Sequence, residues 1–207
     1  ILSDRMQYSI EPDKDATLCR KKRYFMNKIR NAIIYAAKKH EGQVRKGTDT
    51  PYIVHPMEVM QILTAAGCGE DVIAAGILHD TVEDTDATLE EISALFGENV
   101  ARLVAHESED KSKTWRERKS ATIEHLKNCS DEEAICTLAD KLSNARSILA
   151  DYGLVGKKLW ARFNKDKFSL LWYYSQMRNA TKRFSATSIW REYNACVEDM
   201  RRIIEEQ

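Results

Sequence analysis

Apolar residues recur at helical spacing along almost the whole chain, while the residues that punctuate strands are scarce: the 207 residues include only 8 Gly and 3 Pro. A sandwich or barrel of short strands needs many more turn residues than this. The sequence therefore predicts an all-α protein, a bundle of about 8 to 10 helices. We expect helices near residues 26–40, 56–66, 70–83, 88–95, 98–107, 115–127, 131–150, 153–162, 166–183 and 188–205.

The length and the lack of a linker indicate one domain. A chain of 207 residues can bury one substantial core, and no Gly-, Ser- or Pro-rich stretch divides it. The helical pattern settles only after Met26, so residues 1–25 are expected to form a tail, either native or vector-derived. Residues 26–187 then make the domain. Residues 188–207 make an amphipathic C-terminal helix that packs on this domain or on a second copy.

Charge and cysteine content restrict the partners and the compartment. Lys plus Arg and Asp plus Glu number 32 each, so no global field attracts nucleic acid or an anionic membrane. The five cysteines are scattered without a C-x-x-C pair, which favours reduced thiols. Neither a membrane-spanning stretch nor a signal-peptide pattern is found. We expect a cytoplasmic protein with a small-molecule partner, and the sequence leaves its oligomeric state open.

Two histidines and two aspartates have the character of metal ligands. His79 and Asp80 close the apolar run AAGIL, and Asp140 closes AICTLA. A His-Asp pair alone is usually incidental, but a buried carboxylate is costly unless a cation neutralises it. His55 precedes Pro56, which predicts a helix N-cap whose side chain is directed into a cavity. We expect these four residues to converge on one divalent ion.

The donor types and the next helical turn indicate the chemistry. Imidazole and carboxylate ligands without a thiolate suit Mn²⁺, with Fe²⁺ or Zn²⁺ as possible substitutes. An octahedral ion with four protein ligands keeps positions open for water or a phosphate oxygen. Glu83 and Asp84 lie one turn after the His-Asp pair, where a carboxylate can deprotonate a water molecule. The pattern is typical of a hydrolytic metal site.

Three further polar residues suit a phosphate or a nucleobase. Arg45 and Lys46 lie in a glycine-containing loop. Asn144 follows Asp140 by four residues and so shares its helix face. The alternative interpretations are an ordinary solvated pair of cations and a solvent-facing amide. A second basic cluster either forms a charged face or closes over a polyanion as a lid; it comprises Lys111, Lys113, Arg116, Arg118 and Lys119.

Several segments, taken in order, resemble the HD-domain hydrolases of the Rel/SpoT homologue group. The resemblance runs from about residue 26 to about residue 185, and agreement of several motifs in order and spacing is specific. It implies a single HD-type helical bundle with the metal site in its central cleft. It further implies a stand-alone small alarmone hydrolase, without a synthetase domain. The segments are RKGTDTPYIVHP, ILHDTVEDT, EDKSKTWRERK, LADKLSNARSI and LWYY.

The resemblance also implies a reaction. Members of this group remove the 3′-pyrophosphate of guanosine tetra- or pentaphosphate, (p)ppGpp, which gives GDP or GTP and pyrophosphate. The implied residues are His55, His79, Asp80 and Asp140 as ligands of one Mn²⁺, Glu83 and Asp84 as the catalytic pair that activates water, and Arg45, Lys46 and Asn144 as nucleotide contacts.

Two alternatives stay open. The same chemistry could act on adenosine alarmones or other 3′-phosphorylated nucleotides, because nothing in the sequence fixes the base. The second alternative is a binding protein instead of an enzyme: a non-catalytic sensor that binds alarmone. Degenerate members should lose ligands or the acidic pair, and this chain keeps all six residues.

Overall fold

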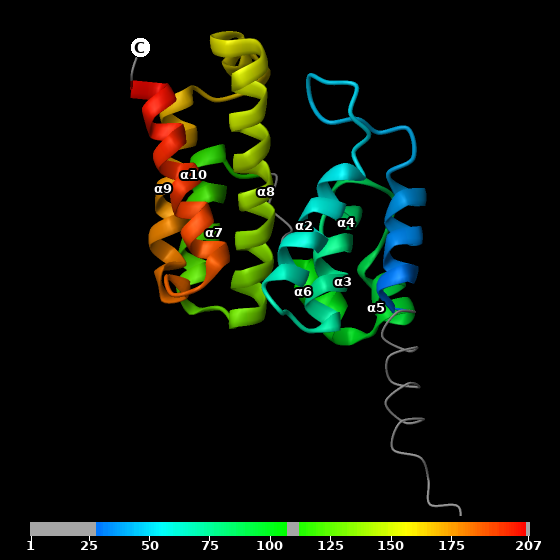
Figure 1. The fold of residues 1–207 in the computed structure, drawn as a ribbon. Helices are drawn as coiled ribbons and strands as arrows, with labels where there is room; N and C mark the ends of the chain where they lie inside the picture. Colours follow the sequence, from blue (N-terminus) through cyan, green and yellow to red (C-terminus); the bar gives the residue numbers. More distant parts are fainter. Residues whose placement is uncertain (1–27, 107–111, 206–207) are drawn as a thin grey trace, which may run out of the picture.

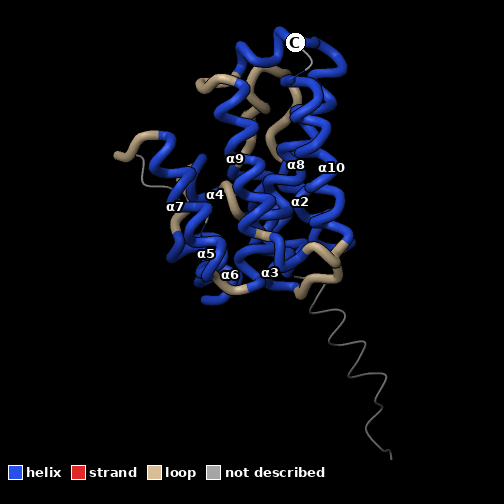
Figure 2. Tube along the Cα trace, turned by 90° about the vertical axis from the view of Figure 1, so that its left-hand side faces the viewer, coloured by secondary structure: helices blue, strands red, loops and turns tan. Residues whose placement is uncertain are grey.

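The computed structural model describes residues 28–106 and 112–205. Within these ranges every named element is a helix, which confirms the expected all-α class (Figures 1 and 2). The expected tail over residues 1–25 lies outside the described residues, as does Lys111. The first helix is described over residues 28–39. It is followed by α2 (Val54–Ala65), α3 (Glu70–Leu78), α4 (Thr81–Asp84), α5 (Leu89–Phe96), α6 (Glu98–His106), α7 (Trp115–Asn128), α8 (Asp131–Val155), the 3-10 helix η1 (Gly156–Arg162), α9 (Lys167–Ala180), the 3-10 helix η2 (Lys182–Phe184) and α10 (Ser188–Glu205).

The long helix α8 stands in the middle of the bundle. The helices α2, α3 and α6 contact it on one side, and α10 contacts it on the other (Figure 1). The last helix also packs on α9, and α7 packs on α9 in turn. One hydrophobic core connects the two groups and includes Leu63, Ile77, Leu142, Met177 and Val197. A side chain on α8 can therefore meet residues from α2 and α3 in the interior.

Local signals explain where α8 begins and ends. Ser130 and Glu133 form a reciprocal capping box at its start. The sequence predicted two helices here, over 131–150 and 153–162, and the structure has two, but the break between them lies later: α8 runs to Val155, and the second is the 3-10 helix η1. The chain stays α-helical through Gly153, since a helical glycine costs only about 1 kcal/mol, which packing can offset. The helix ends at Gly156, whose φ of 59° favours glycine.

The single helix predicted over residues 70–83 is divided. The structure ends α3 at Leu78, places His79 and Asp80 in a turn, and begins α4 at Thr81. The hydroxyl of Thr81 donates to the Leu78 carbonyl at 2.7 Å, a local hydrogen bond that competes with the helical ladder. The His-Asp pair thus lies in the two-residue turn between α3 and α4, and both residues keep right-handed helical backbone angles.

The predicted N-cap position of His55 was also wrong. The N-cap residue of α2 is Ile53, so His55 is the second helical residue and Pro56 the third. The first N–H groups of a helix have no intrahelical partner, so proline at this position removes no hydrogen bond of the ladder. His55 therefore lies in the first turn of α2, and its side chain is buried.

Gly76 sets the distance between α2 and α3. A Cβ atom on Gly76 would lie 2.3 Å from Cδ1 of Leu63 and 3.1 Å from Cγ1 of Val59, both side chains of α2. The absence of a side chain at this position lets the two helices approach closely. This approach brings His55, on α2, to the turn that follows α3.

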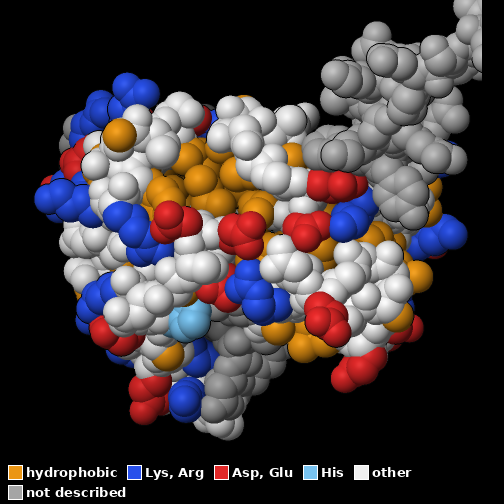
Figure 3. All heavy atoms as spheres, turned by 90° about the horizontal axis from the view of Figure 1, so that it is seen from below, with side chains coloured by type: hydrophobic (Ala, Val, Ile, Leu, Met, Phe, Trp, Pro, Cys, Tyr) orange, Lys and Arg blue, Asp and Glu red, His pale blue; other side chains and the backbone are white. Residues whose placement is uncertain are grey.

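The surface and the cysteines agree with the composition. Acidic and basic side chains are interspersed around an apolar area on the face seen in Figure 3. The described cysteines, Cys68, Cys129, Cys136 and Cys196, are free thiols. No helix in the described part of the chain has the length and apolar character needed to cross a membrane.

Candidate metal centre and active site

The four expected metal ligands meet in the interior. His55 comes from α2, His79 and Asp80 from the turn after α3, and Asp140 from the middle of α8. His55, His79 and Asp80 present ligand atoms within 4.8 Å of one another. Asp140 Oδ1 lies 3.1 Å from His55 Nε2 and 3.7 Å from His79 Nε2. The structure brings together all four residues named from the sequence.

The spacing of these atoms suits a small divalent ion. His79 Nε2 lies 3.0 Å from Asp80 Oδ2 and 3.2 Å from His55 Nε2. Two ligand atoms each about 2.1 Å from one ion are roughly 3.0 Å apart at a right angle and 3.4 Å apart at the tetrahedral angle. Two imidazole nitrogens and two carboxylate oxygens are donors that divalent transition metals accept. The donor set and its spacing therefore fit the metal.

Hydrogen bonds that involve Ser143 and Glu58, which are not among the four expected ligands, fix the tautomer of His55. Ser143 Oγ donates to Glu58 Oε2 at 2.7 Å and lies 2.9 Å from His55 Nδ1. A hydroxyl has one proton, so Ser143 must accept a hydrogen bond from Nδ1–H of His55. The Nε2 atom is then left with a lone pair that points at the cluster. Such a hydrogen bond orients a ligand histidine and raises its basicity.

His79 is oriented by the backbone. Its Nδ1 lies 2.9 Å from the carbonyl oxygen of Gly76, which can only accept, so Nδ1 carries the proton. Nε2 of His79 therefore also directs a lone pair at the cluster, 3.2 Å from Nε2 of His55. Two facing lone pairs at this distance call for a cation or a proton between them. Both Nε2 atoms are therefore placed to bind one metal ion.

The electrostatics of the cluster favour a positive charge. Burial acts to lower the pKa of His79, but the carboxylates of Asp80 and Asp140 outweigh it and raise this pKa well above its ordinary value. Burial likewise acts to raise the pKa of Asp140, but Lys141 and the two imidazoles hold it well below its ordinary value. Burial lowers the pKa of His55. Burial also acts to raise the pKa of Asp80, but His79 holds it below its ordinary value. Two ionised carboxylates, a buried one on Asp140 and a half-buried one on Asp80, therefore face two imidazoles.

The acidic pair lies on the short helix α4, directly after the metal ligands. Glu83 is half-buried and Asp84 is exposed. Tyr52 joins this pair to the cluster, since its hydroxyl lies 2.7 Å from Asp80 Oδ2 and 3.1 Å from Asp84 Oδ2. Gln43 Nε2 also donates to the backbone carbonyl of Asp84 at 2.9 Å. Asp84, one of the two residues expected to activate water, is thus held by hydrogen bonds from the segment that precedes α2.

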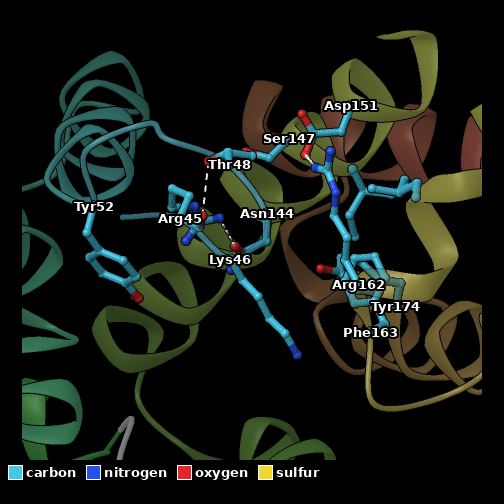
Figure 4. A pocket seen from close by; sticks show the side chains of 12 residues that line it. Arg45, Lys46, Thr48, Tyr52, Asn144, Ser147, Asp151, Arg162, Phe163 and Tyr174 are labelled. Carbon is cyan, nitrogen blue, oxygen red and sulfur yellow. Dashed lines mark hydrogen bonds and ion pairs between the residues drawn. The ribbon is translucent and has the colours of Figure 1, made fainter. Parts of the chain in front are cut away.

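A cavity of about 280 Å³ contains the three expected nucleotide contacts, Arg45, Lys46 and Asn144 (Figure 4). Arg45 Nη2 donates to Asn144 Oδ1 at 2.7 Å, and Asn144 Nδ2 donates to Asp140 Oδ1 at 2.6 Å. This chain of hydrogen bonds connects the cavity to the cluster. The cavity is slightly below the usual size range of ligand pockets, about 300 to 1,000 Å³. Its other lining residues are Thr48, Tyr52, Ser147, Ile148, Asp151, Leu159, Arg162, Phe163 and Tyr174.

Several residues around the cluster and the cavity were not predicted from the sequence. Glu58 follows His55 by three residues and Ser143 follows Asp140 by three, so helical spacing alone places each beside a ligand. That signal was present and was not used. Tyr52 and the residues of η1 gave no such signal, because their positions depend on how the loops fold.

The fold and the cluster define a class, the helical HD-type proteins that carry paired histidines and aspartates. The family model described as HD domain matches residues 32–165, and the chain belongs to this family.

A relative from Danio rerio, guanosine-3′,5′-bis(diphosphate) 3′-pyrophosphohydrolase MESH1, is 45% identical over 119 residues. The match covers 56% of this chain and 66% of that relative. A solved structure of a metazoan ortholog of SpoT, which hydrolyses ppGpp, is 29% identical with a TM-score of 0.70, and the match covers 83% of this chain and 94% of that one. The crystal structure of lmo0812 from Listeria monocytogenes EGD-e is 37% identical with a TM-score of 0.66, and covers 70% of this chain and 96% of that one.

Proposed function

We propose that this chain is a metal-dependent hydrolase that removes the 3′-pyrophosphate of (p)ppGpp and so releases GDP or GTP and pyrophosphate. The observation that carries the proposal is the buried His-Asp cluster next to an acidic pair and a cationic cavity. The activities named for the Danio rerio relative and for the metazoan ortholog of SpoT support the same reaction. We also propose a cytoplasmic setting, in keeping with the free thiols, and a role in the stringent response.

Mn²⁺ is the cofactor that we propose, held by His55, His79, Asp80 and Asp140. The donors are nitrogen and oxygen without sulfur, which suits Mn²⁺ and also allows Fe²⁺ or Zn²⁺. When bound, the ion would supply Lewis acidity toward the 3′-diphosphate and offset its developing negative charge.

The acidic pair is assigned to water activation. A carboxylate of Glu83 or Asp84 accepts a proton from the attacking water, a task that needs a hydrogen bond between base and nucleophile. The Tyr52 hydroxyl shares its one proton between Asp80 at 2.7 Å and Asp84 at 3.1 Å, so it holds the base at a fixed position relative to the ligands. Negative charge that develops on the phosphate oxygens would be stabilised by the fixed positive charge of the site, so that solvent need not reorganise.

The nucleotide is positioned by Arg45, Lys46 and Asn144. Arg45 presents a planar guanidinium that is suited to phosphate or to stacking on a base. Asn144 can both donate and accept, and it is already oriented by Arg45 and Asp140. Lys46 Nζ, which lines the cavity, donates to Asn164 Oδ1 at 3.0 Å. These contacts hold the 3′-diphosphate toward the cluster.

The test is a substrate panel in the presence of Mn²⁺, analysed by nucleotide chromatography. We expect ppGpp to give GDP and pyrophosphate, and chelation of the metal to stop the reaction. A matched adenosine 3′-diphosphate nucleotide shows whether the base matters. If the metal-loaded protein leaves ppGpp intact but hydrolyses another 3′-phosphorylated nucleotide, the substrate assignment is wrong. Tight ppGpp binding without turnover under any metal identifies a sensor instead.

A further inference from the structure

Arg162 is the last residue of η1, and its side chain passes over Gly47 to line the cavity. A Cβ atom on Gly47 would lie 2.6 Å from Cδ and 3.0 Å from Cγ of Arg162, so the arginine stem lies directly against the backbone of the loop that carries Arg45 and Lys46. Gly47 has a φ of 76°, which other residues rarely adopt. The loop and η1 are thus in contact at Gly47, a position that leaves no room for a larger side chain.

The guanidinium of Arg162 is held by one acidic residue. Its Nη1 donates to Asp151 Oδ2 at 2.8 Å, and the Arg162 side chain is 22% exposed. A guanidinium has five N–H donors, and among the described residues Asp151 is its one hydrogen-bond acceptor. Asp151 therefore fixes the direction of Arg162 while most of its donors remain available to a ligand.

The charge of the cavity lining is predominantly positive. Arg45, Lys46 and Arg162 contribute cations, while Asp151 is the one acidic residue among those that line it. Apolar wall is supplied by residues such as Ile148 and Leu159. A cavity with a cationic lining and an apolar wall suits an anionic group attached to a flat or apolar body, as in a nucleotide.

Arg162 lies on the far side of the cavity from the metal cluster. Tyr52, which contacts Asp80 and Asp84, stands at one side of the view in Figure 4, and Arg162 stands at the other, with Arg45 and Asn144 between them. A nucleotide whose 3′-diphosphate is at the cluster must direct another part of itself toward Arg162. Of its remaining parts, only the 5′-phosphate groups carry negative charge.

We propose that Arg162, oriented by Asp151 and seated on Gly47, binds the 5′-phosphate group of the nucleotide and so makes the site selective for substrates phosphorylated at both ends. This inference rests on the proposed function, since it takes the 3′-diphosphate to be the reacting group. Arg162 is a binding residue and takes no part in the bond cleavage. Its removal should therefore change KM rather than kcat.

The test compares two substrates, guanosine 5′-diphosphate 3′-diphosphate and guanosine 3′-diphosphate with a free 5′-hydroxyl, on wild type and Arg162→Gln. A charge-assisted hydrogen bond to phosphate predicts a KM for the first substrate that is raised roughly tenfold or more. The KM for the second substrate should stay within about twofold of wild type, and kcat should change little on either. Arg162→Lys keeps the charge and should retain part of the preference.

Lys158→Gln is the matched control. Lys158 is an exposed cation of the same 3-10 helix and does not line the cavity. Its replacement removes the same charge and should leave both KM values within about twofold. An equal loss on both substrates in Arg162→Gln, or no loss on either, would overturn the proposal, because the arginine would then contact the base or ribose or serve only the fold.

The outcome is separable from that of the proposed function. If wild type hydrolyses neither nucleotide, the dissociation constants of the same two nucleotides are measured by calorimetry on wild type and Arg162→Gln. A preference for the 5′-phosphorylated ligand that disappears in Arg162→Gln supports the binding role even without turnover. A preference that is absent in wild type, or unchanged in the variant, refutes it.

Discussion

The side-chain oxygen of Ser143 lies 2.9 Å from Nδ1 of His55, so a residue outside the cluster decides which imidazole nitrogen faces the metal position. The proton of that hydroxyl is directed to Glu58. This relay prepares the ligand before the metal arrives, since the ring is already in the required tautomer and orientation.

Replacing Ser143 by alanine should weaken metal binding. His55 loses the acceptor for Nδ1–H, and Glu58 is left without its donor. Loss of such an outer hydrogen bond typically costs about 10- to 100-fold in metal affinity. Titration calorimetry with Mn²⁺ measures the change. Ser147→Ala, one turn further along α8, is the control and should bind Mn²⁺ as wild type does; equal affinities in all three proteins would show that the relay has no effect on the ligand.

Addition of metal should raise the melting temperature. An ion that binds only the folded chain at 100 times its Kd stabilises it by about 2.7 kcal/mol. For a domain of this size 1 kcal/mol corresponds to roughly 2 to 4 °C, so a shift of about 5 to 10 °C is expected. Differential scanning calorimetry with and without Mn²⁺ tests this. In Asp140→Asn the shift should be much smaller; a full shift in that variant would place the ion elsewhere.

Gly76→Ala should harm both stability and metal binding. The added methyl group would meet Leu63 at 2.3 Å and Val59 at 3.1 Å, and because Leu63 is fully buried we expect α2 to move away from α3 rather than the Leu63 side chain alone to shift. Overpacking of this kind costs about 1 to 3 kcal/mol. The same movement draws His55 away from His79, and Mn²⁺ affinity should fall as well. Denaturant unfolding and metal titration are the two measurements. Gly153→Ala, where a Cβ meets nothing within 4 Å, should be neutral or slightly stabilising.

The sequence was sufficient for the fold class and for the composition of the cluster. The helical period of the apolar residues is a local property, and the ligands follow apolar runs that are themselves visible. The exact backbone at the ligands was not predictable in the same way. The turn at His79 and Asp80 is accompanied by the hydrogen bond from the Thr81 hydroxyl to the Leu78 carbonyl, and the start of α2 depends on the turn before it.

The residues that surround the cluster were harder to predict for a physical reason. Tyr52 and Asp84 are 32 residues apart, and Arg162 and Gly47 are further apart still. Such pairs are created by tertiary packing and leave no periodic signal in the sequence. Asp151 lies in α8, four residues after Ser147, and both line the cavity.

Tyr52→Phe should slow the reaction without unfolding the protein. The change removes the hydrogen bond to Asp80 and Asp84 but keeps the ring, which lies 4.8 Å from that of His40. Loss of a hydrogen bond to a charged group is worth about 1.5 to 3 kcal/mol, so kcat should fall roughly tenfold or more. Steady-state kinetics of ppGpp hydrolysis measure it. If kcat is unchanged, Tyr52 does not position the acidic pair; if the melting temperature collapses, its role is in folding.

The most direct measurement is the rate of pyrophosphate release from ppGpp at equal Mn²⁺ occupancy in wild type, Glu83→Gln and Asp84→Asn. These substitutions keep the shape of each side chain and remove its ability to accept the proton of a water molecule. General base catalysis contributes about 10²- to 10⁴-fold, so at least one variant should lose about 100-fold or more in rate while its Mn²⁺ affinity stays close to that of wild type. Rates within a few-fold of wild type in both variants would contradict the account, because the cluster would then bind a metal without the acidic pair that makes it a hydrolase.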